Sequence, residues 1–158
     1  MSDFLTLVIA CGFGSAAFGV LFRVKPKHLI FTFIGGMLTT SILLVCLSAF
    51  EGNNLLSNMV SSFFGTLYCI LCAHWRKAPF TVFIVPSLFP LVPGKALYYT
   101  MVGFFEHDKS VFVENVVCAT EIALGIAIGI MIGNIFNTII RSRTRKVVDG
   151  VGRLNKKK

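Results

Sequence analysis

The sequence has few charged residues. Only 14% of its 158 residues are charged and 55% are hydrophobic, whereas an average globular protein has about 25% charged residues. A soluble domain of this size has a large surface relative to its core, and so few charges would not cover that surface in water. A lipid environment removes this conflict, because the exterior can then be apolar. The composition therefore excludes an ordinary soluble domain and indicates an integral membrane protein.

The sequence also lacks the common catalytic and metal-binding motifs. It contains no nucleotide-binding loop, no HExxH, no G-x-S-x-G and no metal-spaced set of His and Cys. Cys69 and Cys72 form a C-x-x-C within an apolar run, without a second pair, and we interpret them as packing residues. The sequence predicts neither an enzyme nor a cofactor nor a metal site. Any transport would be driven by an ion or substrate gradient.

Long apolar runs dominate what is present. A run of about 20 apolar residues crosses a bilayer as a helix, since its backbone must be hydrogen-bonded internally. The first run has no basic segment before it and is long enough to span, so we expect it to remain in the mature protein. We predict an all-α, polytopic fold with five transmembrane helices within 1–140 and a basic cytoplasmic tail over 141–158. The predicted spans are 4–22, 29–50, 55–73, 80–105 and 111–140.

The charges are distributed asymmetrically along the chain. With five alternating spans, all of the 15 Lys and Arg residues except Lys95 and Lys109 fall on one side. The positive-inside rule places that side in the cytoplasm. We therefore predict a cell-membrane protein with its N-terminus outside and its C-terminus in the cytoplasm. We interpret the basic tail as an anchor on anionic membrane lipid rather than a nucleic-acid-binding segment.

The fourth run contains three prolines, Pro86, Pro90 and Pro93, followed at once by Gly94 and Lys95. An interior proline removes a helical hydrogen bond and clashes with the preceding turn, and the residue before it is pushed away from helical geometry. We expect a first half-helix from 80 to about 89, an irregular stretch over 90–94, and a second half-helix from 95 to 105.

Many transporters build their binding sites from broken helices in the middle of the membrane. The N–H groups that open the second half-helix carry partial positive charge and suit a carboxylate. We predict a substrate site at Pro90, Pro93, Gly94, Lys95 and Tyr98. Two alternatives stay open: Lys95 can extend to the membrane interface, and Tyr98 can belong to an interfacial aromatic belt.

The segment PLVPGKALYYT, preceded by Pro86, resembles the signature of the threonine/serine exporter (ThrE-like) superfamily. The matching core is Pro90-x-x-Pro93-Gly94-x-x-x-Tyr98, with Lys95 where a small or apolar residue is expected. The chain most closely resembles the short subunit that forms the C-terminal half of such an exporter. The resemblance implies export of small metabolites, either threonine and serine or succinate, and pairing with a larger membrane subunit.

Three polar residues of the fifth run are further candidates for a function. Glu121 is a candidate proton carrier, or an ion-pair partner of Lys95. Asn134 and Asn137, one turn apart, form interhelical hydrogen bonds or line a polar path.

The fifth run also carries a stripe of small residues. Gly125, Gly129 and Gly133 recur at every fourth position, as Ser15 and Gly19 do in the first run, and this spacing predicts close helix packing, within the chain or in an oligomer. His28 and His74, at cytoplasmic helix ends, are interpreted as interfacial or solvated.

Taken together, these features predict one subunit of a secondary exporter of small polar metabolites. Its expected partners are the small-molecule substrate, membrane lipid and a larger membrane subunit. One alternative function is a membrane scaffold that does not itself transport. The other is a homo-oligomeric channel, which would conduct without a partner.

Overall fold

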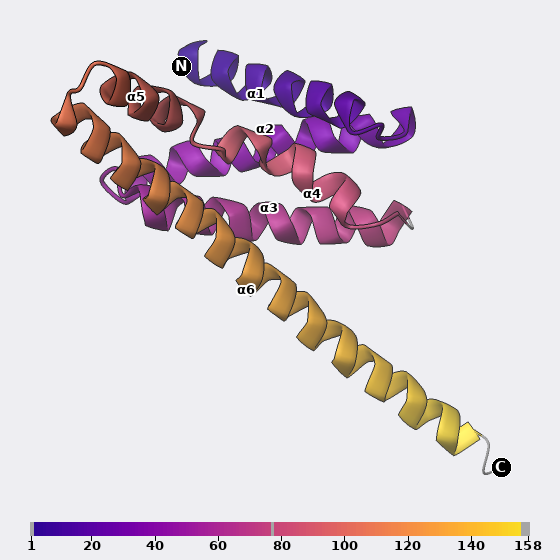
Figure 1. Ribbon diagram of the computed structural model, residues 1–158. Helices are drawn as coiled ribbons and strands as arrows, with labels where there is room; N and C mark the ends of the chain where they lie inside the picture. Colours follow the sequence, from indigo (N-terminus) through magenta and orange to yellow (C-terminus); the bar gives the residue numbers. More distant parts are fainter. Residues whose placement is uncertain (1, 77, 156–158) are drawn as a thin grey trace.

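The computed structural model describes the backbone of residues 2–76 and 78–155, with side chains described over 4–139 except Lys77. In these ranges every regular element is a helix (Figure 1). The elements are α1 (Ser2–Leu21), α2 (Pro26–Ala49), α3 (Asn54–Arg76), α4 (Thr81–Leu88), the 3₁₀ turn η1 (Phe89–Leu91), α5 (Gly94–Phe105) and α6 (Lys109–Asn155).

The helices bear out the predicted class of fold. Four of them, α1, α2, α3 and α6 up to Ile139, are long and apolar enough to cross a membrane. The α4–η1 segment and α5 together form a fifth span, bent by 55°, if the pair is counted as one. This confirms an all-α chain with four to five potential spans. The predicted basic tail falls partly on α6, which continues to Asn155, and its last residues, 156–158, lie outside the described part.

Three interhelical turns begin with a residue in the left-handed backbone conformation, at Arg23, Glu51 and His107, with φ of 54°, 50° and 57°. In each turn a backbone N–H reaches back five residues to satisfy a carbonyl that the helix end leaves free. These bonds are Val24 N to Gly19 O at 2.9 Å, Gly52 N to Leu47 O at 2.9 Å and Asp108 N to Gly103 O at 3.0 Å. The helices after α1, α2 and α5 can therefore reverse direction within a few residues.

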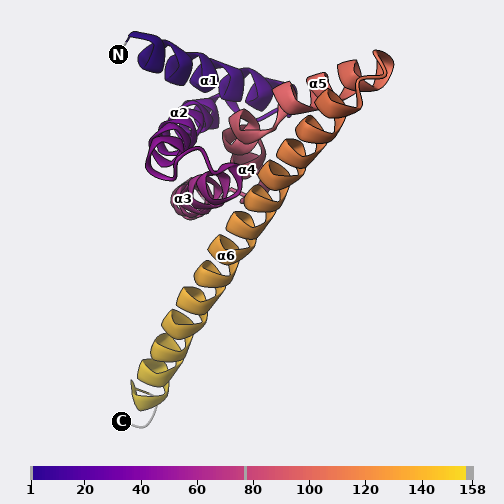
Figure 2. The same cartoon turned by 90° about the vertical axis from the view of Figure 1, so that its left-hand side faces the viewer.

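Helices α1 to α4 lie side by side, and α6 crosses them obliquely along α3 and then extends beyond the bundle (Figures 1 and 2). The glycine stripe makes the α3–α6 contact. A Cβ at Gly125 would lie 2.5 Å from the carbonyl oxygen of Leu55, and one at Gly133 would lie 2.7 Å from Thr66 Cγ2. Because residue numbers rise together along the contact, α3 and α6 run in the same direction, as the third and fifth spans of an alternating chain must.

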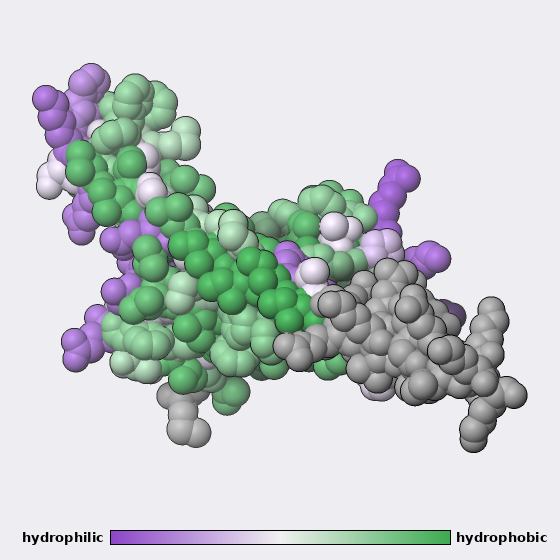
Figure 3. All heavy atoms as spheres, turned by 90° about the horizontal axis from the view of Figure 1, so that it is seen from below, coloured by the Kyte–Doolittle hydropathy of each residue, from purple (hydrophilic) through white to green (hydrophobic). Residues whose placement is uncertain are grey.

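The interior consists mainly of small polar residues. The fully buried side chains include serines and threonines of α1 to α4, and among the described residues Phe83 is the only large aromatic in this group. Large apolar side chains instead face outward, for example Phe13, Leu71 and Phe104, each more than 60% exposed. Figure 3 shows hydrophobic side chains over the middle of one face and hydrophilic ones toward its ends. An apolar exterior of this kind is suited to contact with lipid.

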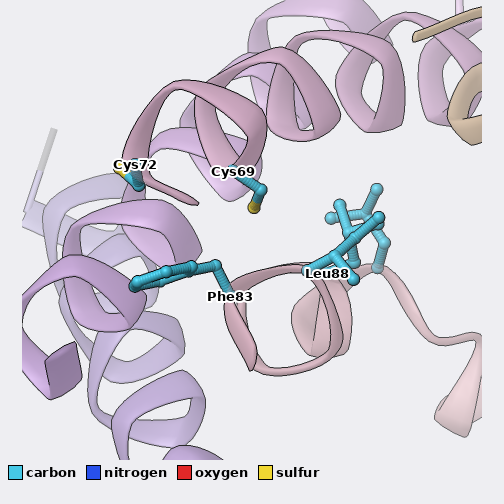
Figure 4. Packing of buried hydrophobic residues seen from close by; sticks show 6 residues of the cluster. Cys69, Cys72, Phe83 and Leu88 are labelled. Carbon is cyan, nitrogen blue, oxygen red and sulfur yellow. The ribbon is translucent and has the colours of Figure 1, made fainter. Parts of the chain in front are cut away.

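A small apolar core lies between α3 and α4. Cys69 and Cys72 of α3 pack with Phe83 and Leu88 of α4 (Figure 4), and both cysteines are free and buried. The prediction that they are packing residues is confirmed. This cluster holds the first half of the broken span against the bundle.

Candidate functional site

The break in the fourth span occupies only two residues. Val92 is extended, with φ −60° and ψ 130°, and Pro93 forms an inverse γ-turn in which Gly94 N donates to Val92 O at 2.7 Å. The predicted irregular stretch of 90–94 is therefore too long, because Phe89–Leu91 close a 3₁₀ turn and Gly94 already begins α5. Pro86 is accommodated inside α4. The position of the break is thus set by Pro90 and Pro93 rather than by all three prolines.

The break follows directly after residues that pack against the centre of the bundle. Ser87 lies against Gly35, and Leu88 lies against Gly65, where a Cβ would come within 3.0 Å of Leu88 Cδ2. Gly65 is the midpoint of α3, and Gly35 is close to the midpoint of α2. The chain therefore breaks about one turn beyond the middle of the helices that surround it.

Hydrogen bonds between small polar residues join three helices at this level. Ser61 Oγ of α3 donates to Thr39 O of α2 at 2.6 Å. Thr39 Oγ1 lies 2.9 Å from Ser87 O of α4 and 3.0 Å from Gly35 O, so its single hydrogen serves these carbonyls. We call Thr39, Ser61 and Ser87, all fully buried, the polar seam. It supplies a donor to the Ser87 carbonyl just before the break.

Several hydroxyls near the seam have no partner among the described residues. Ser87 Oγ and Thr66 Oγ1 are buried without a hydrogen bond, as is Ser57 Oγ nearer the start of α3. A buried unpaired hydroxyl is unfavourable unless water, a ligand or another chain satisfies it. Buried hydroxyl groups that could bind a further polar group therefore lie close to the break.

The start of α5 leaves further groups unpaired. Gly94 N is used by the γ-turn, and Leu97 N donates to Pro93 O at 3.0 Å as the first bond of the helix. Lys95 N and Ala96 N lie between them and have no intrahelical acceptor. Within the described chain, no side chain caps this helix. Two backbone donors and the positive end of the helix dipole thus meet at the break.

A protein-family model described as Threonine/Serine exporter, ThrE, matches residues 7–136, which reach from α1 to α6 and include the break. The chain belongs to the threonine/serine exporter family. It matches no curated protein and no solved structure. The family assignment makes the chain a multi-pass membrane protein of exporter type, in agreement with its apolar helices.

In this exporter-family chain, the predicted substrate-site residues lie together around the break. Pro90 and Pro93 are half-buried, whereas Gly94 and Lys95 are exposed. Tyr98 is 64% exposed, one turn after Gly94 on the same face of α5. Lys95 Nζ lies 6.0 Å from the centroid of the Tyr99 ring, at the limit of a cation–π contact. These groups open onto the surface of the chain rather than into its interior.

The predicted pairing of Lys95 with Glu121 is not formed. No ion pair joins them in the described part of the chain, where Lys95 is exposed and Glu121 is half-buried on α6. Asn134 and Asn137 are also half-buried on α6, and their side chains make no hydrogen bond to another described residue. Their roles in proton coupling or in a polar path stay predictions.

Sequence reasoning missed the polar seam and the surroundings of His28. Ser57, Ser61, Gly65 and Cys69 recur at every fourth position of α3, and all are buried, so this stripe could have been found. His28 lies near a helix end, as predicted; it is half-buried, and its ring packs edge-to-face on Phe83 at a centroid distance of 5.4 Å. The neighbour on α4 is distant in sequence, so no local pattern indicated it.

Proposed function

We propose that this chain is one part of a two-part secondary exporter that moves a small polar metabolite out of the cytoplasm. The substrate class is threonine and serine or a small dicarboxylate such as succinate. The other part is a larger membrane subunit of the same family. The observation that carries this proposal is the break between η1 and α5, where Gly94 and Lys95 are exposed and the N–H groups of Lys95 and Ala96 have no helical acceptor.

These polar groups need a covering that the chain itself does not provide. Irregular backbone within a membrane persists only where it is buried in protein or lines a watery cavity. Gly94 and Lys95 are exposed, and the N–H groups of Lys95 and Ala96 have no helical acceptor. A second subunit packed against this face would exclude lipid and enclose a path. This argument favours a partner over a chain that works alone.

The chemistry of the break suits a carboxylate. The N–H groups at the start of α5 carry partial positive charge, and Lys95 adds a full charge beside them. Tyr98 adds a hydroxyl one turn along the same face. We propose that these residues hold the substrate carboxylate, and that Glu121 carries the coupling proton.

The charge distribution supports a proposed orientation of the chain in the membrane. The chain lies in the plasma membrane with its basic loops and C-terminus in the cytoplasm, because all of the 15 Lys and Arg residues except Lys95 and Lys109 fall on that side. The α1–α2 and α3–α4 loops then face the cytoplasm, and the turn between α5 and α6 faces outward.

The test is efflux from cells loaded with amino acids and dicarboxylates, expressing this chain, the larger subunit or both. Efflux only with both supports the two-part exporter and identifies its substrate class. Conductance from this chain alone would instead indicate a channel. A stable complex without efflux of any compound would indicate a scaffold.

A matched pair of variants tests the role of the break. A Cβ atom added at Gly94 or at Gly14 would meet no neighbouring atom within 4 Å. Both Gly94→Leu and Gly14→Leu should therefore insert into the membrane, but only Gly94→Leu should abolish efflux, because it fills the proposed site. If the two variants give equal efflux, the substrate site is not at the break.

A further inference from the structure

A cavity of about 540 Å³ opens at the end of the bundle where α1 turns into α2 and α3 leads to α4. This volume is within the usual range for small-molecule sites. The cavity lies at the opposite end of α4 from the break. Its lining residues are Phe22, Arg23, Val24, Lys25, His28, Arg76, Ala78, Pro79, Thr81, Val82, Val85 and Pro86.

The polar side of this cavity is strongly basic. Arg23 and Lys25 come from the α1–α2 loop and Arg76 from the end of α3, about 50 residues away in the sequence, and none of the lining residues is acidic. Within the described part of the chain no salt bridge neutralises these three cations. Like charges gathered around one cavity repel each other, and an anion bound between them would relieve that repulsion.

Arg76 is held in position for such a ligand. Its guanidinium donates from Nη2 to Lys27 O at 3.3 Å and lies 4.9 Å from the centroid of the Phe31 ring. A guanidinium has five N–H donors in a planar fork, so most of them stay available for a carboxylate. The contact with Phe31 already restricts the Arg76 side chain, so less conformational entropy is lost when a ligand binds.

His28 contributes an unsatisfied polar atom to the same wall. Its Nδ1 is buried without a hydrogen-bond partner among the described residues, and its ring is fixed against Phe83. A buried polar atom in the wall of a cavity can form a hydrogen bond with a polar ligand that enters the cavity. It adds an independent sign that the cavity accepts a polar group.

The cavity continues along α4 toward the break. Its wall includes Val82, Val85 and Pro86, and the next residue, Ser87, belongs to the polar seam. A ligand would therefore meet basic groups at the mouth and an apolar wall beyond them. The far end of that wall is one turn from Phe89, where the 3₁₀ turn begins.

We propose that this cavity is a binding site for a small carboxylate, in which Arg23, Lys25, His28 and Arg76 hold the anion before it reaches the break. It deepens the proposed function and relies on it only for the direction of transport. An ammonium group would be repelled by the basic lining. The site should therefore bind a dicarboxylate more tightly than a zwitterionic amino acid.

Binding of radiolabelled succinate to the purified full chain in phosphatidylcholine nanodiscs tests the site. We expect Arg76→Gln and Lys25→Gln each to weaken binding about tenfold or more, since each loses a charged hydrogen-bond donor. Lys109→Gln removes the same charge from an exposed side chain at the start of α6 that does not line the cavity, and it should bind nearly as the unaltered chain does. Equal binding by all three variants, or no binding at all, would overturn the proposal.

Two further measurements distinguish a carboxylate site from a lipid site, and the site from the exporter. If phosphatidylglycerol binds in mixed nanodiscs and succinate does not, and Arg76→Gln releases the lipid, the cavity is a lipid headgroup site and the proposal fails. Efflux is measured in parallel with the larger subunit. If succinate binds but no compound is exported, the proposed site stands and the proposed exporter function is refuted. If Arg76→Gln leaves efflux unchanged, the proposed site is refuted and the exporter function stands.

Discussion

Replacing Gly125 by alanine tests the packing of α6 on α3. The new Cβ would lie 2.5 Å from the carbonyl oxygen of Leu55, whereas ordinary contact begins at 3.4 Å, so the two helices would have to separate by about 1 Å. Neither atom belongs to a flexible side chain, and rotamer changes cannot relieve the clash. Overpacking of this kind costs about 1–3 kcal/mol.

Alanine also improves helix propensity by about 0.5–1 kcal/mol relative to glycine, and this gain must be separated from the clash. Gly14→Ala provides the control, because a Cβ at Gly14 would meet nothing within 4 Å. The difference between the two variants then isolates the packing term. For a chain of this size, about 1–3 kcal/mol corresponds to a midpoint of thermal denaturation about 2–12 °C lower.

The assay is thermal denaturation of the purified chain in detergent, followed by loss of the monodisperse peak in size-exclusion chromatography. Gly133→Ala should give an intermediate result, because its nearest neighbour is the Thr66 side chain, which can move, rather than backbone. The order expected is Gly14→Ala most stable, then Gly133→Ala, then Gly125→Ala. Equal midpoints for Gly125→Ala and Gly14→Ala would refute the close, parallel packing of α3 and α6.

Three further substitutions test the seam and the proposed coupling. Ser61→Ala removes the donor to Thr39 O and should destabilise the chain by about 1 kcal/mol, seen as a lower denaturation midpoint than that of Ser48→Ala, whose hydroxyl is exposed. Ser87→Ala removes a buried hydroxyl without a partner among the described residues, so the stability of the chain should be equal or higher. If efflux falls while stability is retained, this hydroxyl contacts the substrate. Glu121→Gln should abolish the pH dependence of efflux. If the variant and the unaltered chain show the same pH dependence over pH 5–8, Glu121 is not the proton carrier.

The sequence by itself determined the class of the molecule and the broken span. Length, apolar runs and charge placement are one-dimensional properties, and lipid permits few solutions to them. Proline has no N–H at any position, so the break near Pro90 and Pro93 was visible before any tertiary contact was known. The signature around these prolines also indicated the family, which the match over residues 7–136 confirms.

Tertiary structure decided what surrounds the break. It brought Thr39, Ser61 and Ser87 from three helices to one level, and it kept Lys95 and Glu121 from forming an ion pair. It also assembled the basic cavity from the α1–α2 loop and the end of α3, which are distant in the sequence. Helix packing in a membrane depends on where small residues allow close approach, and on hydrogen bonds between helices. Those contacts link residues 20 to 60 positions apart, so the spacing within any one helix could not reveal them.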